Sequence, residues 1–160
     1  MGSPAMGTIR RGSKVPAFSA PATGCTRVDS EDLLGSPFVL YFYPKDNTPG
    51  CVFEGRDFSR HHEQFVRRGA AVFGVSRDTI DSHEKFKARH GFPFELIADE
   101  DEKLCGLFGV IREKVRIGRK LFGVERSTFL IDPEGVLRRE WRKVRLPGHV
   151  HEILKALDEL

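Results

Sequence analysis

The chain has 160 residues, of which 39% are hydrophobic and 31% are charged, and its formal net charge at pH 7 is +3. This length suits one domain with a sizeable core, and the composition is typical of a soluble globular protein. It excludes a membrane-spanning helix, because no apolar run approaches about 20 residues, and an N-terminal secretion signal, because no apolar core follows Met1.

We expect a tail over residues 1–12, with a remnant of an expression vector at 1–5, and one domain over 13–160. The three cysteines, Cys25, Cys51 and Cys105, are odd in number and irregularly spaced, so they do not form a disulfide framework. A reducing compartment such as the cytoplasm is therefore expected.

The first elements alternate with residues that favour turns. Residues 15–24 contain several Pro and Gly and predict a short N-terminal hairpin with residues 26–28. One helical turn should follow, capped by Asp29 or Ser30. The apolar run at residues 38–43 then predicts a buried strand.

A helical pattern runs over residues 51–68 and places Phe58, Phe65 and Val66 on its apolar face. Gly69 should end this helix, since glycine is favoured just after the last helical turn.

Short strands and helices continue to alternate after this point. Residues 70–76 and 94–98 predict strands, whereas 79–89 predict a polar helix that ends at Gly91 and 101–108 predict a short helix.

Residues 111–123 are basic and contain glycine, and the pattern defines no structure for them. The run at 127–132 predicts a third long strand, which should pair with residues 136–144 as a hairpin. Leu137 and Trp141, four residues apart, are expected to face the same side.

A final helix after Pro147 should carry Val150, Ile153, Leu154 and Leu157 on one face. Strands that alternate with helices and end in a hairpin and a helix predict an α/β protein. We expect a thioredoxin-like fold, with a mixed central β-sheet flanked by helices, an N-terminal β-hairpin extension and an inserted segment.

Cys51 is the main candidate for chemistry, since it follows the Pro49-Gly50 loop and lies in the first turn of a predicted helix. The unpaired N–H groups and the positive end of the helix dipole both favour a thiolate there, and the thiolate is the nucleophilic form of cysteine.

One reaction open to such a thiolate is the reduction of a peroxide. This reaction also needs an oriented substrate and hydrogen-bond donors for the leaving oxygen. The hydroxyl of Thr48 could point to both the sulfur and the peroxide, and Pro44 could cover the pocket without an N–H donor. Backbone N–H groups at Gly50 and Cys51 supply donors. Arg126, just before the strand at 127, could stabilise the thiolate and polarise the peroxide.

Each of these residues also has a purely structural interpretation. Cys51 could be a small buried hydrophobic residue, Thr48 a helix cap and Pro44 a strand end. Arg126 could form a surface ion pair. Glu54 could orient Arg126 or simply complete the helix N-terminus, so it stays outside the predicted catalytic set.

The segment Tyr41-Phe-Tyr-Pro-Lys-Asp-Asn-Thr-Pro-Gly-Cys51 closely resembles the active-site segment of the peroxiredoxins, in the form found in the bacterioferritin-comigratory or PrxQ branch. The likeness continues, in the same order, at residues 74–78, 94–99 and 125–135. It covers roughly residues 13–158, and several motifs in one order make it specific.

The resemblance implies a thiol-dependent peroxidase that reduces hydrogen peroxide and organic hydroperoxides, with a role in antioxidant defence and redox homeostasis. The family's active-site roles fall on Pro44, Thr48, Cys51 and Arg126. It also implies a monomer or weak dimer that needs no cofactor.

Many members of this branch carry a second cysteine that resolves the oxidised one, but the two usual positions hold Arg56 and Ala88 here. Cys105, in an apolar helical stretch, and Cys25, in a turn, remain as candidates. We favour a one-cysteine mechanism, in which thioredoxin, glutaredoxin with glutathione, or a small thiol is the reductant.

Other classes of function receive less support. The six histidines lack the spacing of a zinc site and are expected to be exposed helix and turn residues. Basic residues gather in 112–120 and 138–145, where we expect solvated surface and no nucleic-acid or membrane partner. A thiol–disulfide exchange protein would need a second cysteine near Cys51, and a redox sensor of the same fold stays open.

Overall fold

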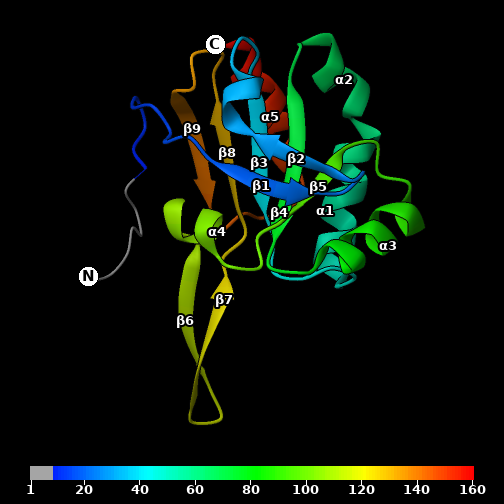
Figure 1. Cartoon of the computed structure of the whole chain (residues 1–160), viewed down its shortest axis with the longest axis vertical. Coiled ribbons are helices and arrows are strands. Elements are labelled where there is room, and N and C mark those ends of the chain that lie inside the picture. Colours follow the sequence, from blue (N-terminus) through cyan, green and yellow to red (C-terminus); the bar gives the residue numbers. More distant parts are fainter. Residues whose placement is uncertain (1–8) are drawn as a thin grey trace.

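The computed structural model describes residues 9–160 and has a seven-stranded mixed sheet, a separate two-stranded ribbon and five α-helices (Figure 1). The strands are β1 (Ser19–Ala22), β2 (Thr26–Asp29), β3 (Phe38–Phe42), β4 (Ala71–Ser76), β5 (Glu95–Ala98), β6 (Ile111–Arg116), β7 (Arg119–Val124), β8 (Ser127–Ile131) and β9 (Leu137–Arg142). The helices are the 3-10 turn η1 (Ser30–Leu33), α1 (Pro49–Arg60), α2 (His62–Arg67), α3 (Ile80–His90), α4 (Lys103–Leu107) and α5 (His149–Asp158).

The large sheet has the strand order β2-β1-β5-β4-β3-β8-β9. β3, β4 and β5 are parallel, whereas the outer strands pair antiparallel. Parallel strands need crossover helices, and these cover the sheet on its faces. The expected α/β, thioredoxin-like arrangement with an N-terminal hairpin (β1–β2) is therefore confirmed.

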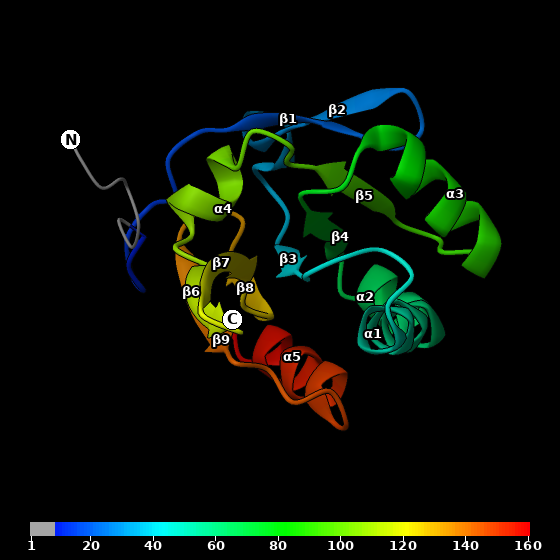
Figure 2. The same ribbon diagram turned by 90° about the horizontal axis from the view of Figure 1, so that it is seen from below.

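β3 lies inside the sheet between β4 and β8, and all five of its residues are buried. Its side chains alternate between two cores. Val39 and Tyr41 belong to a core with α1, α2, α3 and α5, while Phe38, Leu40 and Phe42 belong to a core with β1, β2 and α4. Figure 2 shows α1, α2 and α5 on one side of the inner strands β3 and β4, and α4 with the outer strands β1 and β2 on the other.

The predicted single helix over 51–68 is wrong, because the structure divides it into α1 and α2 at His61. The His61 ring nitrogen Nδ1 lies 2.9 Å from the Asp57 carbonyl oxygen, so the side chain shares this acceptor with the backbone N–H of residue 61. The change of direction keeps Phe65 buried but leaves Val66 exposed, contrary to the expected apolar face.

The expectation that Leu137 and Trp141 face the same side is also wrong. Leu137 pairs with Ile131 and Arg139 pairs with Leu130, so a β-bulge places one extra residue on β9. One extra residue reverses the alternation of side chains. As a result, Leu137 and Trp141 pack into different cores.

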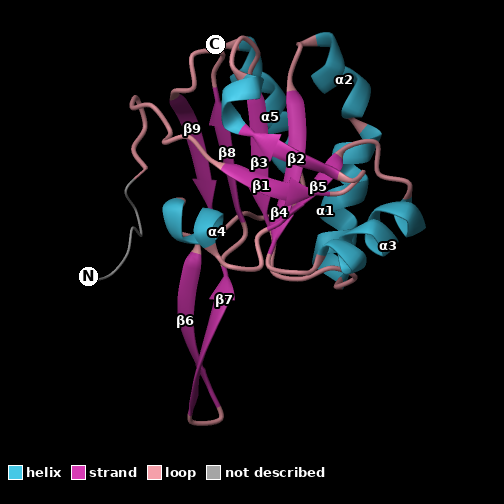
Figure 3. Ribbon diagram, viewed as in Figure 1, coloured by secondary structure: helices cyan, strands magenta, loops and turns pink. Residues whose placement is uncertain are grey.

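The segment that the sequence left undefined is a hairpin, in which β6 pairs with β7 from Ile111–Val124 to Arg116–Arg119. Figure 3 shows this ribbon extending away from the body, paired with no strand of the large sheet. Ile117 and Gly118 form its two-residue turn, both with positive φ.

The chain start is described only from residue 9. Ile9 is buried, and the N–H of Gly12 donates to the Leu137 carbonyl. The expected remnant at 1–5 lies outside the described residues, and the boundary between tail and domain at residue 12 stays a prediction. Over residues 9–160, no helix combines the length and apolar character needed to cross a membrane.

Candidate active site

Cys51 is the third residue of α1, which follows the carboxyl end of the inner strand β3 after a short loop. Pro49 begins the helix, where its missing N–H costs nothing because the first N–H groups of a helix have no partner within it. Thr48 occupies the N-cap position, and its carbonyl accepts the first helical bond, from Val52. The buried Cys51 sulfur therefore lies close to unpaired backbone donors and to the positive end of the helix dipole.

Arg126 meets Cys51 because β8 pairs antiparallel with β3, with Phe42 opposite Ser127. This register places the residue before β8 beside the loop after β3. Arg126 Nη2 lies 3.6 Å from the Cys51 sulfur, within the range of a hydrogen bond to sulfur. Gly50 gives the guanidinium room, because a Cβ at this position would lie 3.0 Å from Nη2.

Glu54 binds the other side of the same guanidinium. Its Oε1 accepts from Arg126 Nη1 at 2.6 Å, while Oε2 is buried and has no hydrogen-bond partner among the described residues. Sequence reasoning left Glu54 undecided between a helix-terminal role and a partner for Arg126, and the structure shows the ion pair.

Burial governs the charges of this pair. It raises the pKa of Glu54 from 4.5 to about 7, although the Arg126 charge acts against this rise. For Arg126, burial alone would lower the pKa, but the neighbouring Glu54 and Cys51 outweigh it and raise the pKa further. The guanidinium therefore stays positively charged next to the sulfur at neutral pH.

Thr48 and Pro44 lie in the loop that joins β3 to α1. The Thr48 hydroxyl donates to the Lys45 carbonyl at 2.8 Å and makes no capping bond to the helix. Its oxygen keeps lone pairs that can accept another hydrogen bond. Pro44 is exposed at the start of this loop. The predicted contacts of both residues with the peroxide stay predictions.

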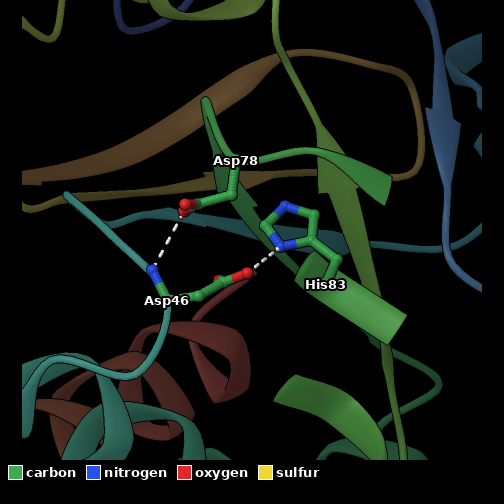
Figure 4. Close-up of side chains that lie close together, drawn as sticks. All are labelled: Asp46, Asp78 and His83. Carbon is green, nitrogen blue, oxygen red and sulfur yellow. Dashed lines mark hydrogen bonds and ion pairs between the residues drawn. The ribbon is translucent and has the colours of Figure 1, made fainter. Parts of the chain in front are cut away.

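An anchor that the sequence did not indicate holds this loop in place (Figure 4). Asp46 is buried, and its N–H donates to Asp78 at 2.9 Å. Its carboxylate accepts from the hydroxyls of Tyr43 and Ser82 and faces His83 Nδ1, each at 2.7 Å. Nothing in the spacing of these residues pointed to the contact, since Asp46 and His83 come from different elements.

The same cluster is the one group among the described residues whose ligand atoms lie close enough to hold a metal ion, namely Asp46, Asp78 and His83. However, His83 Nε2 faces the Ile97 carbonyl at 2.9 Å, so both ring nitrogens have oxygen acceptors. Each ring nitrogen is therefore already engaged in a hydrogen bond within the chain, which leaves neither of them free for a metal. We therefore describe the cluster as a buried hydrogen-bonded anchor.

The expectation that the histidines are exposed is confirmed only for His151, because His61, His62 and His90 are half-buried and two others are fully buried. His83 and His149 are buried, because each finds polar partners in the core. His149 Nε2 lies 2.8 Å from the Thr128 hydroxyl, and burial lowers the pKa of His149.

The two remaining cysteines lie far from this site in the fold. Cys105 is buried in α4, where its N–H donates to Asp99, and burial raises the pKa of its thiol strongly. It packs in the core on the opposite face of the sheet from Cys51. A direct disulfide between them would have to pass through the sheet.

Cys25 is exposed in the turn between β1 and β2. The neighbouring Gly24 lies against Glu95, the first residue of β5. Because β5 runs parallel to β4 and β3, this end of β5 is at the edge of the sheet opposite to the carboxyl end of β3. Cys25 and Cys51 therefore lie toward opposite edges.

The structure thus brings together Cys51, Arg126 and Glu54, with Thr48 and Pro44 in the adjoining loop, and it does not bring Cys25 or Cys105 to them.

Known proteins are similar along nearly the whole chain. A family model described as AhpC/TSA family matches residues 11–140. Peroxiredoxin Bcp of Xanthomonas campestris pv. campestris is 47% identical over 135 residues, which are 84% of each chain. Peroxiredoxin Bcp of Bacillus subtilis is 44% identical over 153 residues, covering 96% of this chain and 98% of the relative.

Solved structures agree with these relatives. Xanthomonas campestris peroxiredoxin Q matches with a TM-score of 0.86 at 45% identity, covering 89% of this chain and 90% of that one. A cysteine-to-serine variant of Xylella fastidiosa PrxQ matches with a TM-score of 0.86 at 40% identity, covering 99% and 98%. On this likeness of sequence and fold, the chain belongs to the AhpC/TSA family and, within it, to the Bcp/PrxQ branch of the peroxiredoxins.

Proposed function

We propose that this peroxiredoxin reduces hydrogen peroxide and organic hydroperoxides with the thiolate of Cys51, and that an external thiol then restores it. The observation that carries the proposal is the 3.6 Å contact between Arg126 Nη2 and the Cys51 sulfur at the N-terminus of α1. A cation and a helix N-terminus beside one sulfur both stabilise its thiolate.

In the first step the thiolate attacks the hydroxyl oxygen of the hydroperoxide. An S–O bond forms, the O–O bond breaks, and the sulfur is oxidised by two electrons to a sulfenic acid. The leaving oxygen takes a proton from solvent, in place of the one that the thiol lost on ionising, and departs as an alcohol or water. Arg126 is positioned to donate to the oxygen on which negative charge develops.

Thr48 would orient the peroxide. Its hydroxyl proton is directed to the Lys45 carbonyl, so its oxygen is left to accept a hydrogen bond from the peroxide O–H. Pro44 would shield the loop side of the pocket, since it offers no N–H that could bind water.

The sulfenic acid would be cleared by a thiol from outside the chain. One thiol condenses with it to give a mixed disulfide and water, and a second thiol releases the Cys51 thiolate. The burial of Cys105 on the other face of the sheet and the place of Cys25 at the other edge support this one-cysteine mechanism. Thioredoxin, or glutaredoxin with glutathione, would supply the thiols.

The similar bacterioferritin comigratory protein of Xanthomonas campestris, 44% identical, has alkyl peroxide reduction activity, which supports organic hydroperoxides as substrates here. Thiol–disulfide exchange is less well supported, because Glu54 lies where a second cysteine would be needed. The odd cysteine count favours a reducing compartment such as the cytoplasm, and the proposed chemistry requires no partner subunit.

The test is steady-state consumption of hydrogen peroxide and cumene hydroperoxide, measured with thioredoxin and thioredoxin reductase and separately with glutathione and glutaredoxin. Wild type should turn over with at least one of these systems, and Cys51→Ser should not. Turnover by Cys51→Ser, or a single stoichiometric oxidation of the wild type with both systems, would rule the proposal out.

A further inference from the structure

The β6–β7 hairpin exposes an unusual amount of apolar surface. It projects from the body and pairs with no other strand (Figure 1). Four of its large apolar side chains are exposed, namely Val115 at 66%, Ile117 at 99%, Leu121 at 50% and Phe122 at 57%. They run from the middle of the hairpin to its tip, and several exposed apolar groups on one projecting element usually mark a contact with another surface.

The hairpin is also strongly basic. It carries five basic residues and one acidic residue, so its charge of +4 exceeds the +3 of the whole chain. Glu113 and Glu125 lie within 4.0 Å of Lys120 and Arg112. Three basic side chains have no carboxylate partner among the described residues, and these are Lys114, Arg116 and Arg119.

The backbone at the tip of the hairpin is strained. Ile117 and Gly118 have φ of 52° and 71°, and a turn with two positive φ values normally holds Asn-Gly or Asp-Gly. A β-branched residue strains this conformation, and at 99% exposure Ile117 makes no compensating contact within the chain. The side chain is therefore suited to an apolar contact outside it.

Three kinds of partner differ in how well they match this surface. A second copy of the chain would present the same positive charge and be repelled. A nucleic acid would pair with the basic residues but would leave the aliphatic tip in water, because bases stack on aromatic or guanidinium planes. A bilayer with anionic lipids satisfies both features, with phosphates for the basic residues and an apolar interior for the tip.

We propose that the β6–β7 hairpin docks this protein onto the surface of an anionic lipid bilayer, with Ile117 inserted at the level of the headgroups. The long stems of Arg116 and Arg119, which lie opposite each other next to the tip, extend along the hairpin while their charges bind lipid phosphates. This departs from the sequence-based expectation of a solvated segment without a membrane partner. It is independent of the chemistry at Cys51.

The test is co-sedimentation of the full chain with vesicles of phosphatidylcholine and phosphatidylglycerol, compared with vesicles of phosphatidylcholine alone. The wild type should bind the anionic vesicles only. Raising the salt to about 1 M should release it, because the Debye length falls to about 3 Å and screens the phosphate contacts.

Two variants separate the tip from the charges. Ile117→Asn suits the positive φ, so it should keep or raise the thermal stability while the vesicle partition falls several-fold. Arg116→Glu with Arg119→Glu should lower the partition by at least about twentyfold, at roughly fivefold for each basic residue removed.

The matched control is Arg67→Glu with Lys155→Glu, which makes the same change in net charge at exposed positions of α2 and α5. It should bind vesicles nearly as the wild type does, and all variants should consume hydrogen peroxide normally in solution.

Two results with vesicles would overturn the proposal: no binding of wild type to anionic vesicles at low salt, or an equal loss of vesicle binding in the control variant. Hairpin-dependent binding of duplex DNA or RNA without lipid binding would also overturn it, and so would hairpin-dependent dimers without lipid binding.

Discussion

Arg126 is shared between two partners, the Cys51 sulfur at 3.6 Å and the Glu54 carboxyl group at 2.6 Å. The guanidinium fork donates one nitrogen to each, which fixes the orientation of a long and otherwise flexible side chain. Glu54 thereby acts on the sulfur through Arg126, so it is a positioning residue and not a group that touches the peroxide.

Loss of the guanidinium should slow the oxidation of Cys51. For Arg126→Ala we expect a decrease of about 10²–10³ in the second-order rate constant with hydrogen peroxide, since removing one donor to a developing charge typically costs this much. Arg126→Lys should recover only part, because an ammonium group cannot reach both partners. Stopped-flow measurement of thiol loss checks this, with exposed Arg67→Ala as the control. A rate for Arg126→Ala within threefold of wild type would contradict it.

Glu54 should make stability depend on pH. Its pKa rises from 4.5 in the unfolded chain to about 7 in the fold, so the folded state holds this proton more tightly. The resulting stabilisation is complete below pH 4.5 and is lost as pH rises through 7, by on the order of 3 kcal/mol. Glu54→Gln removes this term, so its free energy of unfolding relative to wild type should increase between pH 5 and pH 8.

Urea unfolding at the two pH values measures this difference. Asp81→Asn, at an exposed carboxylate of α3, is the control. Its free energy of unfolding relative to wild type should stay the same between pH 5 and pH 8. An identical pH dependence for wild type and Glu54→Gln would show that the carboxylate titrates normally.

At the scale of elements, the loop that carries the active site is held by a helix outside it. Asp46 ties the loop to α3 through Ser82 and His83 and to the end of β4 through Asp78. The start of α1, and with it Cys51, is therefore positioned by two elements that contribute no group to the chemistry.

Asp46→Asn should break this anchor. The amide replaces one acceptor oxygen of the buried carboxylate by an NH2 group, so at least one polar group that faces it loses its hydrogen bond, and we expect a loss of about 1–3 kcal/mol in the free energy of unfolding. The oxidation rate of Cys51 should fall as well, because the loop loses its fixed position. Asp81→Asn, in an exposed pair with Lys85 on the same helix, should leave both nearly unchanged. Equal unfolding midpoints for the two variants would contradict the anchor.

Close packing of α1 also depends on a glycine. A Cβ at Gly55 would lie 2.4 Å from Phe92, which is buried and stacks on Phe94. We expect Gly55→Ala to destabilise the protein by about 1–3 kcal/mol through overpacking.

The matched substitution is Gly106→Ala in α4, where the added Cβ meets no atom within 4 Å. It should leave the free energy of unfolding unchanged or raise it by up to about 1 kcal/mol. Thermal unfolding compares the two glycine variants, and a stable Gly55→Ala would mean that Phe92 can move aside.

At the scale of the whole molecule, the sheet itself separates the cysteines. Cys51 and Cys105 belong to cores on its two faces, and Cys25 lies toward the edge opposite to Cys51. After one equivalent of peroxide, mass spectrometry should therefore find a sulfenic acid or its adduct on Cys51 and no disulfide within the chain.

Cys25→Ser and Cys105→Ser should both keep steady-state turnover with an external thiol, whereas Cys51→Ser should lose it. An intramolecular disulfide in most molecules would show that the fold opens to bring two sulfurs together, against the one-cysteine mechanism.

The positive charge is unevenly distributed over the molecule. The hairpin carries more positive charge than the chain as a whole, so the remaining body is close to neutral. A projecting cationic ribbon on a neutral body orients the molecule toward an anionic surface, consistent with the docking proposed for it.

Much of the fold could be predicted from local pattern alone. Hydrophobic runs, Gly69 and Gly91 as helix ends, and the position of Cys51 at a helix start all depend on residues near one another in the chain, and the structure confirms them. The sequence did not predict three features: the β-bulge in β9, the break at His61 and the hairpin at 111–124. Strand pairing sets the bulge and the hairpin, and competition for a backbone hydrogen bond sets the break, and neither can be read from a pattern of residue types.

The sequence by itself determined the fold class, the position of Cys51 at a helix start and the family, since these follow from periodicity and from contiguous motifs. Only the tertiary structure decided that Glu54 holds Arg126, that His83 holds Asp46, and that neither remaining cysteine lies beside Cys51. The physical reason is that these contacts join residues from different elements, so the register of the strands and the packing of the helices set their distances, and the spacing along the chain does not.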